Sequence, residues 1–199
     1  MPGVKSLVTV ALLAVAVACS TNRAYMSGGD VELSLATPAS LGTDETTLLR
    51  QMSDANILGH LMAVDSLEVT MADTALRHIK SDDVVNYAKM MHLAHADDWK
   101  GLKDLAGATG IIPTIDVTKL RSSHVAAGID SVRKTSDITK DQQFIRAQIE
   151  LHQHALAELQ VLEGVAKASA LRSHITDMMP VVRDHLARAM TLAKPLGVR

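Results

Sequence analysis

The sequence has very few aromatic residues and a single cysteine. Of its 199 residues, one is Trp, two are Tyr and one is Phe, although 47% are hydrophobic. The core must therefore consist of Leu, Ile, Val, Met and Ala, which include the strongest apolar helix formers. One cysteine excludes a disulfide framework. The formal net charge is −2 with acids and bases interspersed, which predicts neither a nucleic-acid partner nor a polybasic membrane patch.

Several catalytic motifs are also missing. The sequence contains no nucleophile elbow, no phosphate-binding loop and no CxxC pair. Ferritin-like di-iron sites need Glu-x-x-His on two helices, but Glu68, Glu150, Glu158 and Glu163 are followed three residues later by Met, Gln, Val and Ala. A dinuclear oxidase or an iron store is therefore disfavoured.

The N-terminus has the pattern of an export signal. Lys5 provides a positive charge, and residues 7–18 form a run of twelve mostly apolar residues. This run is too short to span a bilayer and has the length of a signal-peptide core. We therefore predict that residues 1–18 are a signal peptide.

The signal ends in "AVAC", where small residues precede Cys19. This resembles the lipobox of bacterial lipoproteins, in which the cysteine is lipidated and becomes the mature N-terminus; the alternative is a plain secretory signal cleaved nearby. The resemblance implies a lipid anchor at Cys19 on the periplasmic side of the cell envelope. Ser20 in place of Asp favours the outer membrane over the inner one. Residues 19–43, rich in Ser, Thr, Gly and Pro, are predicted to be a flexible tether.

Apolar residues then recur at steps of three and four, which is typical of amphipathic helices. The pattern predicts four helices, at about residues 44–78, 81–110, 141–168 and 171–194, with Pro180 kinking the last. Short connections join the first and last pairs, and a long crossover joins helices two and three. We therefore predict an all-α domain over residues 44–194, an antiparallel four-helix bundle of ferritin-like connectivity.

Each predicted helix carries one ionisable residue on its apolar stripe: Glu68, His95, His152 and His185. Counting from the short turns at 1.5 Å per residue places the two members of each helix pair within roughly 5 Å of one level. All four lie near the middle of their helices, so they should meet in one layer. His92, one turn before His95, is a possible additional ligand.

Two explanations of this layer compete. The three imidazoles and the carboxylate could satisfy one another by hydrogen bonds and only fix the packing. Alternatively, they could bind one divalent ion, because a His₃Glu set suits Zn²⁺, Fe²⁺ or Mn²⁺ and helix-bundle cores are where such sites are built. Both explanations stay open at this point.

The motifs that carry these residues resemble those of the ferritin-like "domain of unknown function 4142" family, often described as exported or outer-membrane bacterial proteins. The resemblance covers roughly residues 44–194 and rests on "EVTMADTAL…VVNYAKMMHLAH" (68–95), "ELHQHAL" (150–156) and "MPVVRDHLARA" (179–189). The family's recurring polar positions fall on the same four residues. The chain departs from the family at Ala94 and Leu151, where an acid is common and could orient an imidazole.

The main hypothesis is therefore an envelope lipoprotein that binds one divalent metal ion, with a role in metal handling or stress protection. The rival is a structural or interaction lipoprotein whose polar layer only sets packing. A third hypothesis, a small redox or hydrolytic enzyme, requires a cavity beside the four residues, which solid packing by Met91, Leu156 and Met178 would exclude. The sequence favours a non-enzymatic role and identifies no protein partner.

Overall fold

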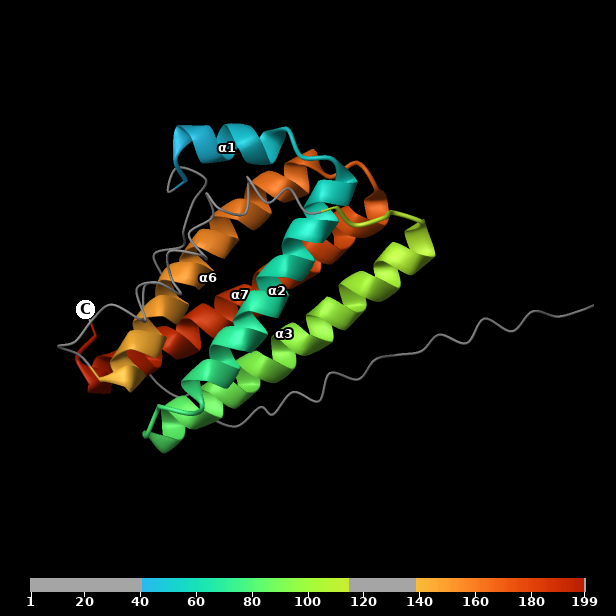
Figure 1. Cartoon of the computed structure of the whole chain (residues 1–199). Coiled ribbons are helices and arrows are strands. Elements are labelled where there is room, and N and C mark those ends of the chain that lie inside the picture. The colour runs from blue at the N-terminus through green and yellow to red at the C-terminus, as the bar shows by residue number, and fades with distance from the viewer. Residues whose placement is uncertain (1–40, 115–138, 199) are drawn as a thin grey trace, which may run out of the picture. The chain divides into compact units, whose positions relative to one another are not determined.

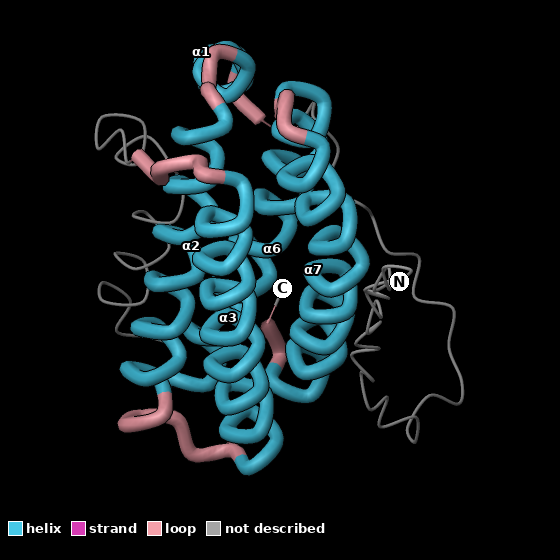
Figure 2. Tube along the Cα trace, turned by 90° about the vertical axis from the view of Figure 1, so that its right-hand side faces the viewer, coloured by secondary structure: helices cyan, strands magenta, loops and turns pink. Residues whose placement is uncertain are grey.

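The computed structural model describes residues 41–114 and 139–198 of the chain. The part of the chain that it describes contains helices and connecting loops but no strand (Figures 1 and 2), which confirms the all-α prediction. The five helices are α1 (Thr43–Arg50), α2 (Asp54–Ala75), α3 (Asp82–Thr109), α6 (Lys140–Val165) and α7 (Ser169–Leu196).

The prediction of one helix over residues 44–78 is wrong, because the chain turns between α1 and α2. Ser53 caps α2: its Oγ accepts a hydrogen bond from the Asn56 backbone N–H at 3.2 Å, and Asn56 Oδ1 accepts one from the Ser53 N–H at 3.4 Å. This reciprocal capping box starts a new helix. The short helix α1 then packs against α6 (Figure 1), with Leu49 buried.

The four long helices pack as two pairs, α2 with α3 and α6 with α7, and the pairs meet through α3–α7 and α2–α6 contacts. Side-chain contacts give the directions. Along α2 and α6, Glu68 pairs with Gln148 and His60 with Glu158, so these helices are antiparallel. The diagonal helices α3 and α6 run in the same direction, and most of their connection falls in residues 115–138, outside the described residues.

Each helix pair caps the turn of the other. The Asp54 carboxylate at the start of α2 accepts hydrogen bonds from the backbone N–H groups of Lys167 and Ala168, at 2.8 and 2.9 Å, in the α6–α7 turn. The Asp141 carboxylate at the start of α6 accepts bonds from Lys80 and Ser81 in the α2–α3 turn. These bonds satisfy backbone donors that helix and turn ends otherwise leave unpaired, and they fix the register between the pairs.

The apolar core is divided into two clusters along the helix axes. The first cluster includes Leu61, Leu102, Leu156 and Leu186. The second includes Met71, Met91, Leu151 and Ala189. On α2, α3 and α6 the mid-helix ionisable residue falls between the buried members of the two clusters, and on α7 His185 is next to Leu186, the last buried residue of the first cluster. The polar layer therefore separates two halves of the core.

Helix α7 continues through Pro180 without a break. Among the described residues, no helix has the length and apolar character needed to cross a membrane. The predicted signal peptide, Cys19 and most of the predicted tether lie outside the described residues.

Candidate metal centre

Three histidines from three helices meet at the boundary between the core clusters. One ring nitrogen each of His95 (α3), His152 (α6) and His185 (α7) lies within 4.8 Å of the corresponding nitrogens of the other two. The ring centroids are 5.4–6.0 Å apart. His152 and His185 are buried, and the His95 side chain is 12% exposed. We call these residues the histidine triad.

Each triad member has one buried ring nitrogen with no hydrogen-bond partner among the described residues: His95 Nε2, His152 Nε2 and His185 Nδ1. An unpaired buried polar atom is costly, and native proteins satisfy almost all of them. Three converging rings, each with one such nitrogen, offer a set of donors that suits a metal ion.

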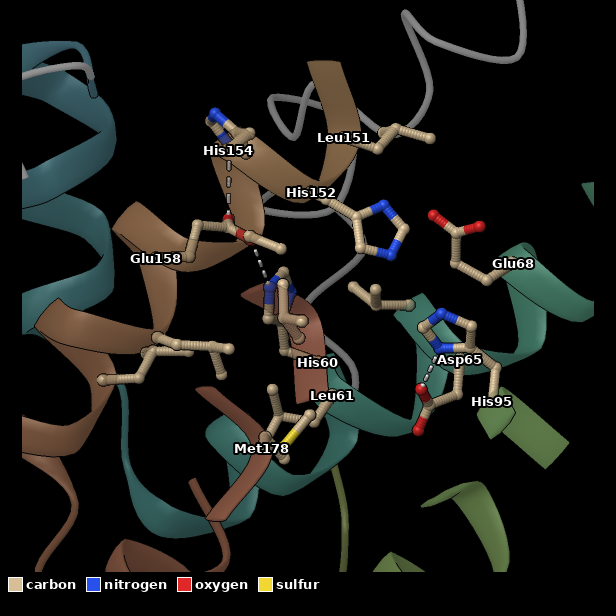
Figure 3. Close-up of a pocket in the computed structure, with 15 residues that line it drawn as sticks. His60, Leu61, Asp65, Glu68, His95, Leu151, His152, His154, Glu158 and Met178 are labelled. Carbon is tan, nitrogen blue, oxygen red and sulfur yellow. Dashed lines mark hydrogen bonds and ion pairs between the residues drawn. The ribbon is translucent and has the colours of Figure 1, made fainter. Parts of the chain in front are cut away.

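Two triad members are oriented through their other nitrogen. His152 Nδ1 donates to the carbonyl oxygen of Gln148, one turn earlier on α6, at 2.8 Å. A carbonyl can only accept, so the proton sits on Nδ1 and the Nε2 of the neutral ring carries a lone pair. His95 Nδ1 lies 2.8 Å from Asp65 Oδ1 (Figure 3). A backbone carbonyl and a carboxylate are the usual partners of metal-binding histidines.

The surroundings keep the triad uncharged. Burial, followed by repulsion from the neighbouring imidazoles, lowers the pKa of His152 well below its usual value. The same two causes lower the pKa of His185 to about 4, and burial lowers the pKa of His95. Neutral imidazole is the form that binds metals, so near neutral pH all three rings have the protonation state of ligands.

Glu68, the fourth predicted ligand, is buried beside the triad but falls outside the group of converging donors. Its Oε2 accepts a hydrogen bond from Gln148 Nε2 at 2.8 Å. Burial raises the pKa of Glu68, while His95 and Gln148 act to lower it. Figure 3 shows the Glu68 carboxylate next to the His152 ring. The structure therefore brings the acid beside the site without making it one of the three converging ligands.

His92, the predicted additional ligand, is not brought into this group. Its Nδ1 lies 2.9 Å from Asp73 Oδ1 of α2, and its side chain is 35% exposed. The arrangement therefore contains the predicted histidine from each of three helices and leaves the extra one near the surface.

Sequence reasoning missed the residues that support the triad. Asp65 is buried, and burial, followed by the nearby Asp98 carboxylate, raises its pKa to about 9. Gln148 is fully buried between Glu68 and the Tyr87 hydroxyl, whose oxygen lies 3.3 Å from Gln148 Oε1. The available signal was spacing, since Asp65 precedes Glu68 by three residues and Gln148 precedes His152 by four, so each lies on the same face as its neighbour.

A cavity of about 40 Å³ adjoins the triad, large enough for a few water-sized groups. Glu68, His95 and His152 line one part of it, and His60, His154 and Glu158 line another (Figure 3). The enzyme hypothesis requires that Met178 does not fill this space, and Met178 instead lines the cavity. The core beside the triad is therefore not packed solid.

The model of the family "Domain of unknown function (DUF4142)" matches residues 39–192. The chain therefore belongs to this family, and the match includes every described helix except the last residues of α7. Comparison with curated proteins and with solved structures gives no match.

Proposed function

We propose that this protein binds one divalent metal ion through His95, His152 and His185. The observation that carries the proposal is the convergence of three imidazoles from three helices, each with a buried ring nitrogen that has no hydrogen-bond partner among the described residues. The rival hypothesis, a polar layer that only fixes packing, expects these atoms to be paired with one another. Their lack of partners favours the metal.

The donor set favours a borderline ion such as Zn²⁺, Fe²⁺ or Mn²⁺. Three imidazoles leave at least one coordination position open, as in zinc sites that hold water or substrate at the fourth position. Glu68 is the residue best located to fill that position or to hydrogen-bond to a group there. A metal on His95 Nε2 would need the ring proton on Nδ1, where Asp65 Oδ1 can accept it, so Asp65 would orient the ring. The positive charge of the ion would favour the ionised form of Asp65, whose pKa burial and Asp98 raise in the metal-free protein.

The fold and the N-terminal sequence suggest the setting. Four long helices whose second and third members run parallel would have ferritin-like connectivity, and the family match is consistent with the resemblance of the motifs. With lipidation at Cys19, the domain would be held at the periplasmic side of the envelope, in the outer membrane. We propose a role in metal handling or stress protection there, in preference to turnover of a defined substrate.

The test is the metal content of the full chain, purified without a histidine tag, measured beside His152→Ala. The matched control is His78→Ala, because His78 is exposed and lies in the turn after α2. We expect near-stoichiometric metal in the wild type and in the control, and a loss of the triad-bound metal in His152→Ala. A folded wild type that takes up no metal when Zn²⁺, Fe²⁺ or Mn²⁺ is supplied would establish the packing role instead.

A further inference from the structure

A second buried cluster lies on the other part of the cavity. It contains Glu45 of α1, His60 of α2, and His154 and Glu158 of α6, and we call it the carboxylate cluster. His154 Nε2 lies 2.8 Å from Glu45 Oε1 and 3.6 Å from Glu158 Oε1. His60 Nε2 lies 3.4 Å from Glu158 Oε2. No side chain among these four is more than 13% exposed.

The donors of this cluster converge as closely as those of the triad. One donor atom each of Glu45, His154 and Glu158 lies within 4.8 Å of the other two. His60 approaches Glu158 from a third helix, and its Nδ1 is buried with no partner in the described part of the chain. The four side chains together offer two carboxylates and two imidazoles, a mixture that divalent zinc, iron and manganese accept.

From this convergence we infer that Glu45, His154 and Glu158, with His60 as a fourth ligand, form a second divalent-metal site. It is separate from the triad, because His152 and His154 are two residues apart on α6 and point to different sides of that helix. The cavity between them is shared by residues of both sites. The inference goes beyond the proposed function and uses none of the three triad residues.

The charge of the cluster is suited to a cation. Buried carboxylates need a positive partner, and in the metal-free protein His154 lies between the carboxylates of Glu45 and Glu158. A divalent cation held by the same side chains would face both carboxylates and provide that positive partner.

The second site would also attach α1 to the long helices. Glu45 is its only ligand from α1, and α1 packs mainly against α6. Metal binding should therefore hold α1 in place, whereas metal at the triad should not affect it directly. This difference gives a readout that metal content alone does not provide.

The test is the zinc stoichiometry of the full chain after equilibration with zinc ions, measured for the wild type, Glu45→Gln and Glu158→Gln. The control is Asp44→Asn, which removes the exposed acid next to Glu45. We expect two zinc ions per chain in the wild type and in the control, and one in each glutamate variant. Loss of a ligand should weaken the second site at least as much as loss of a group that only orients a ligand, about tenfold or more. Hydrogen exchange of α1 should slow with zinc in the wild type and not in Glu45→Gln.

The outcomes separate this inference from the proposed function. One zinc per wild-type chain, lost in His152→Ala and kept in Glu158→Gln, would overturn the second site and leave the triad. One zinc lost in both glutamate variants and kept in His152→Ala would do the reverse. Two zinc ions in every glutamate variant would overturn the second site, and no zinc in the wild type would overturn both. Should Glu158→Gln fail to fold, the wild-type stoichiometry and Glu45→Gln decide.

Discussion

Both polar clusters beside the cavity contain histidine, but the histidine pKa is lowered in one cluster and raised in the other. In the histidine triad, burial and neighbouring imidazoles lower the pKa of His152. In the carboxylate cluster, burial also acts to lower the pKa of His154, but hydrogen bonds and charge from Glu158 and Glu45 outweigh it and raise the pKa. Two histidines on one helix, two residues apart, are thus tuned in opposite directions by what faces them.

The difference shows how burial and charge combine in a helical core. Burial penalises the charged form of any group, so the sign of the final shift depends on whether the neighbours carry opposite charge. At the triad the three imidazoles face one another, and the uncharged His152 ring keeps a lone pair on Nε2. The carboxylate cluster pairs its charges internally, so a metal there must displace a proton, whereas a metal at the triad displaces none from His152 Nε2.

The largest expected effect concerns acid unfolding of the metal-free protein. Burial would raise the pKa of Glu158, but hydrogen bonds from His154 and His60 lower it to about 2 from 4.5. Because the folded-state pKa is below the unfolded one, this stabilisation is complete above pH 4.5 and is lost as the pH falls toward 2. It amounts to roughly 3 kcal/mol at most, at about 1.4 kcal/mol per pKa unit. The measurement is the free energy of unfolding against pH, in chelator, for the wild type and Glu158→Gln.

The difference between these two proteins should be largest from about pH 5 to 6.5, the usual His154 pKa, and should shrink as the pH falls below 4.5. It should also shrink at higher pH, where His154 loses the proton that pairs with Glu158. A difference that does not change with pH would mean that Glu158 stabilises the fold by packing and not by its charge.

The next effect concerns metal-dependent stability at the triad. A ligand that binds only the folded state at a free concentration 100 times its Kd adds about 2.7 kcal/mol, which corresponds to roughly 5–10 °C in Tm for a chain of this size. In a Glu158→Gln background, which removes the second site, zinc should raise Tm by this amount, and His152→Ala should abolish the rise. An equal rise in the His152→Ala variant would show that the stabilising ion binds elsewhere.

A smaller effect is expected for the group that orients a triad ligand. Asp65→Asn removes the carboxylate partner of His95 Nδ1 and should weaken zinc binding at the triad by about 10- to 100-fold. Asp184→Asn is the matched control, since Asp184 is next to His185 in the sequence but its side chain is exposed and paired with Arg188. Isothermal titration with zinc measures both. Equal affinities for wild type and Asp65→Asn would contradict an orienting role for Asp65.

The smallest expected effect distinguishes the two clusters, because only the carboxylate cluster has a residue on α1. Ser53→Ala removes the cap that turns the chain between α1 and α2, at a cost of about 1 kcal/mol. Because Glu45 is on α1 and the triad is not, the substitution should weaken the carboxylate cluster and leave zinc affinity at the triad unchanged. Hydrogen exchange of α1 together with zinc titration checks both halves of this prediction.

The sequence predicted that His95, His152 and His185 meet at one depth along the bundle, because the rise per residue of an α-helix is constant. Counting residues from a turn determines depth along the axis, and periodicity determines the face. Neither quantity depends on side-chain rotamers. Membership of the family and the all-helical fold were predictable for the same reason, since both rest on spacing and on residue type.

The partners of the triad were not predictable in this way. Whether Asp65 reaches His95, or Gln148 reaches Glu68, depends on rotamers and on contacts across helices that a single-helix pattern does not contain. The split at Ser53 was missed because a capping box can be formed by Asn at the third position, and apolar periodicity continues across it. The carboxylate cluster was missed because the face of α6 that bears His154 is buried only when α1 packs there.

The central claim is that the histidine triad holds a metal ion. The most direct measurement is an anomalous difference map at the zinc absorption edge, from crystals of the full chain grown with zinc. The account predicts a peak about 2.0–2.1 Å from one nitrogen of each of His95, His152 and His185. Clear density for the three rings with no anomalous peak between them, and with water molecules hydrogen-bonded to their nitrogens, would contradict it.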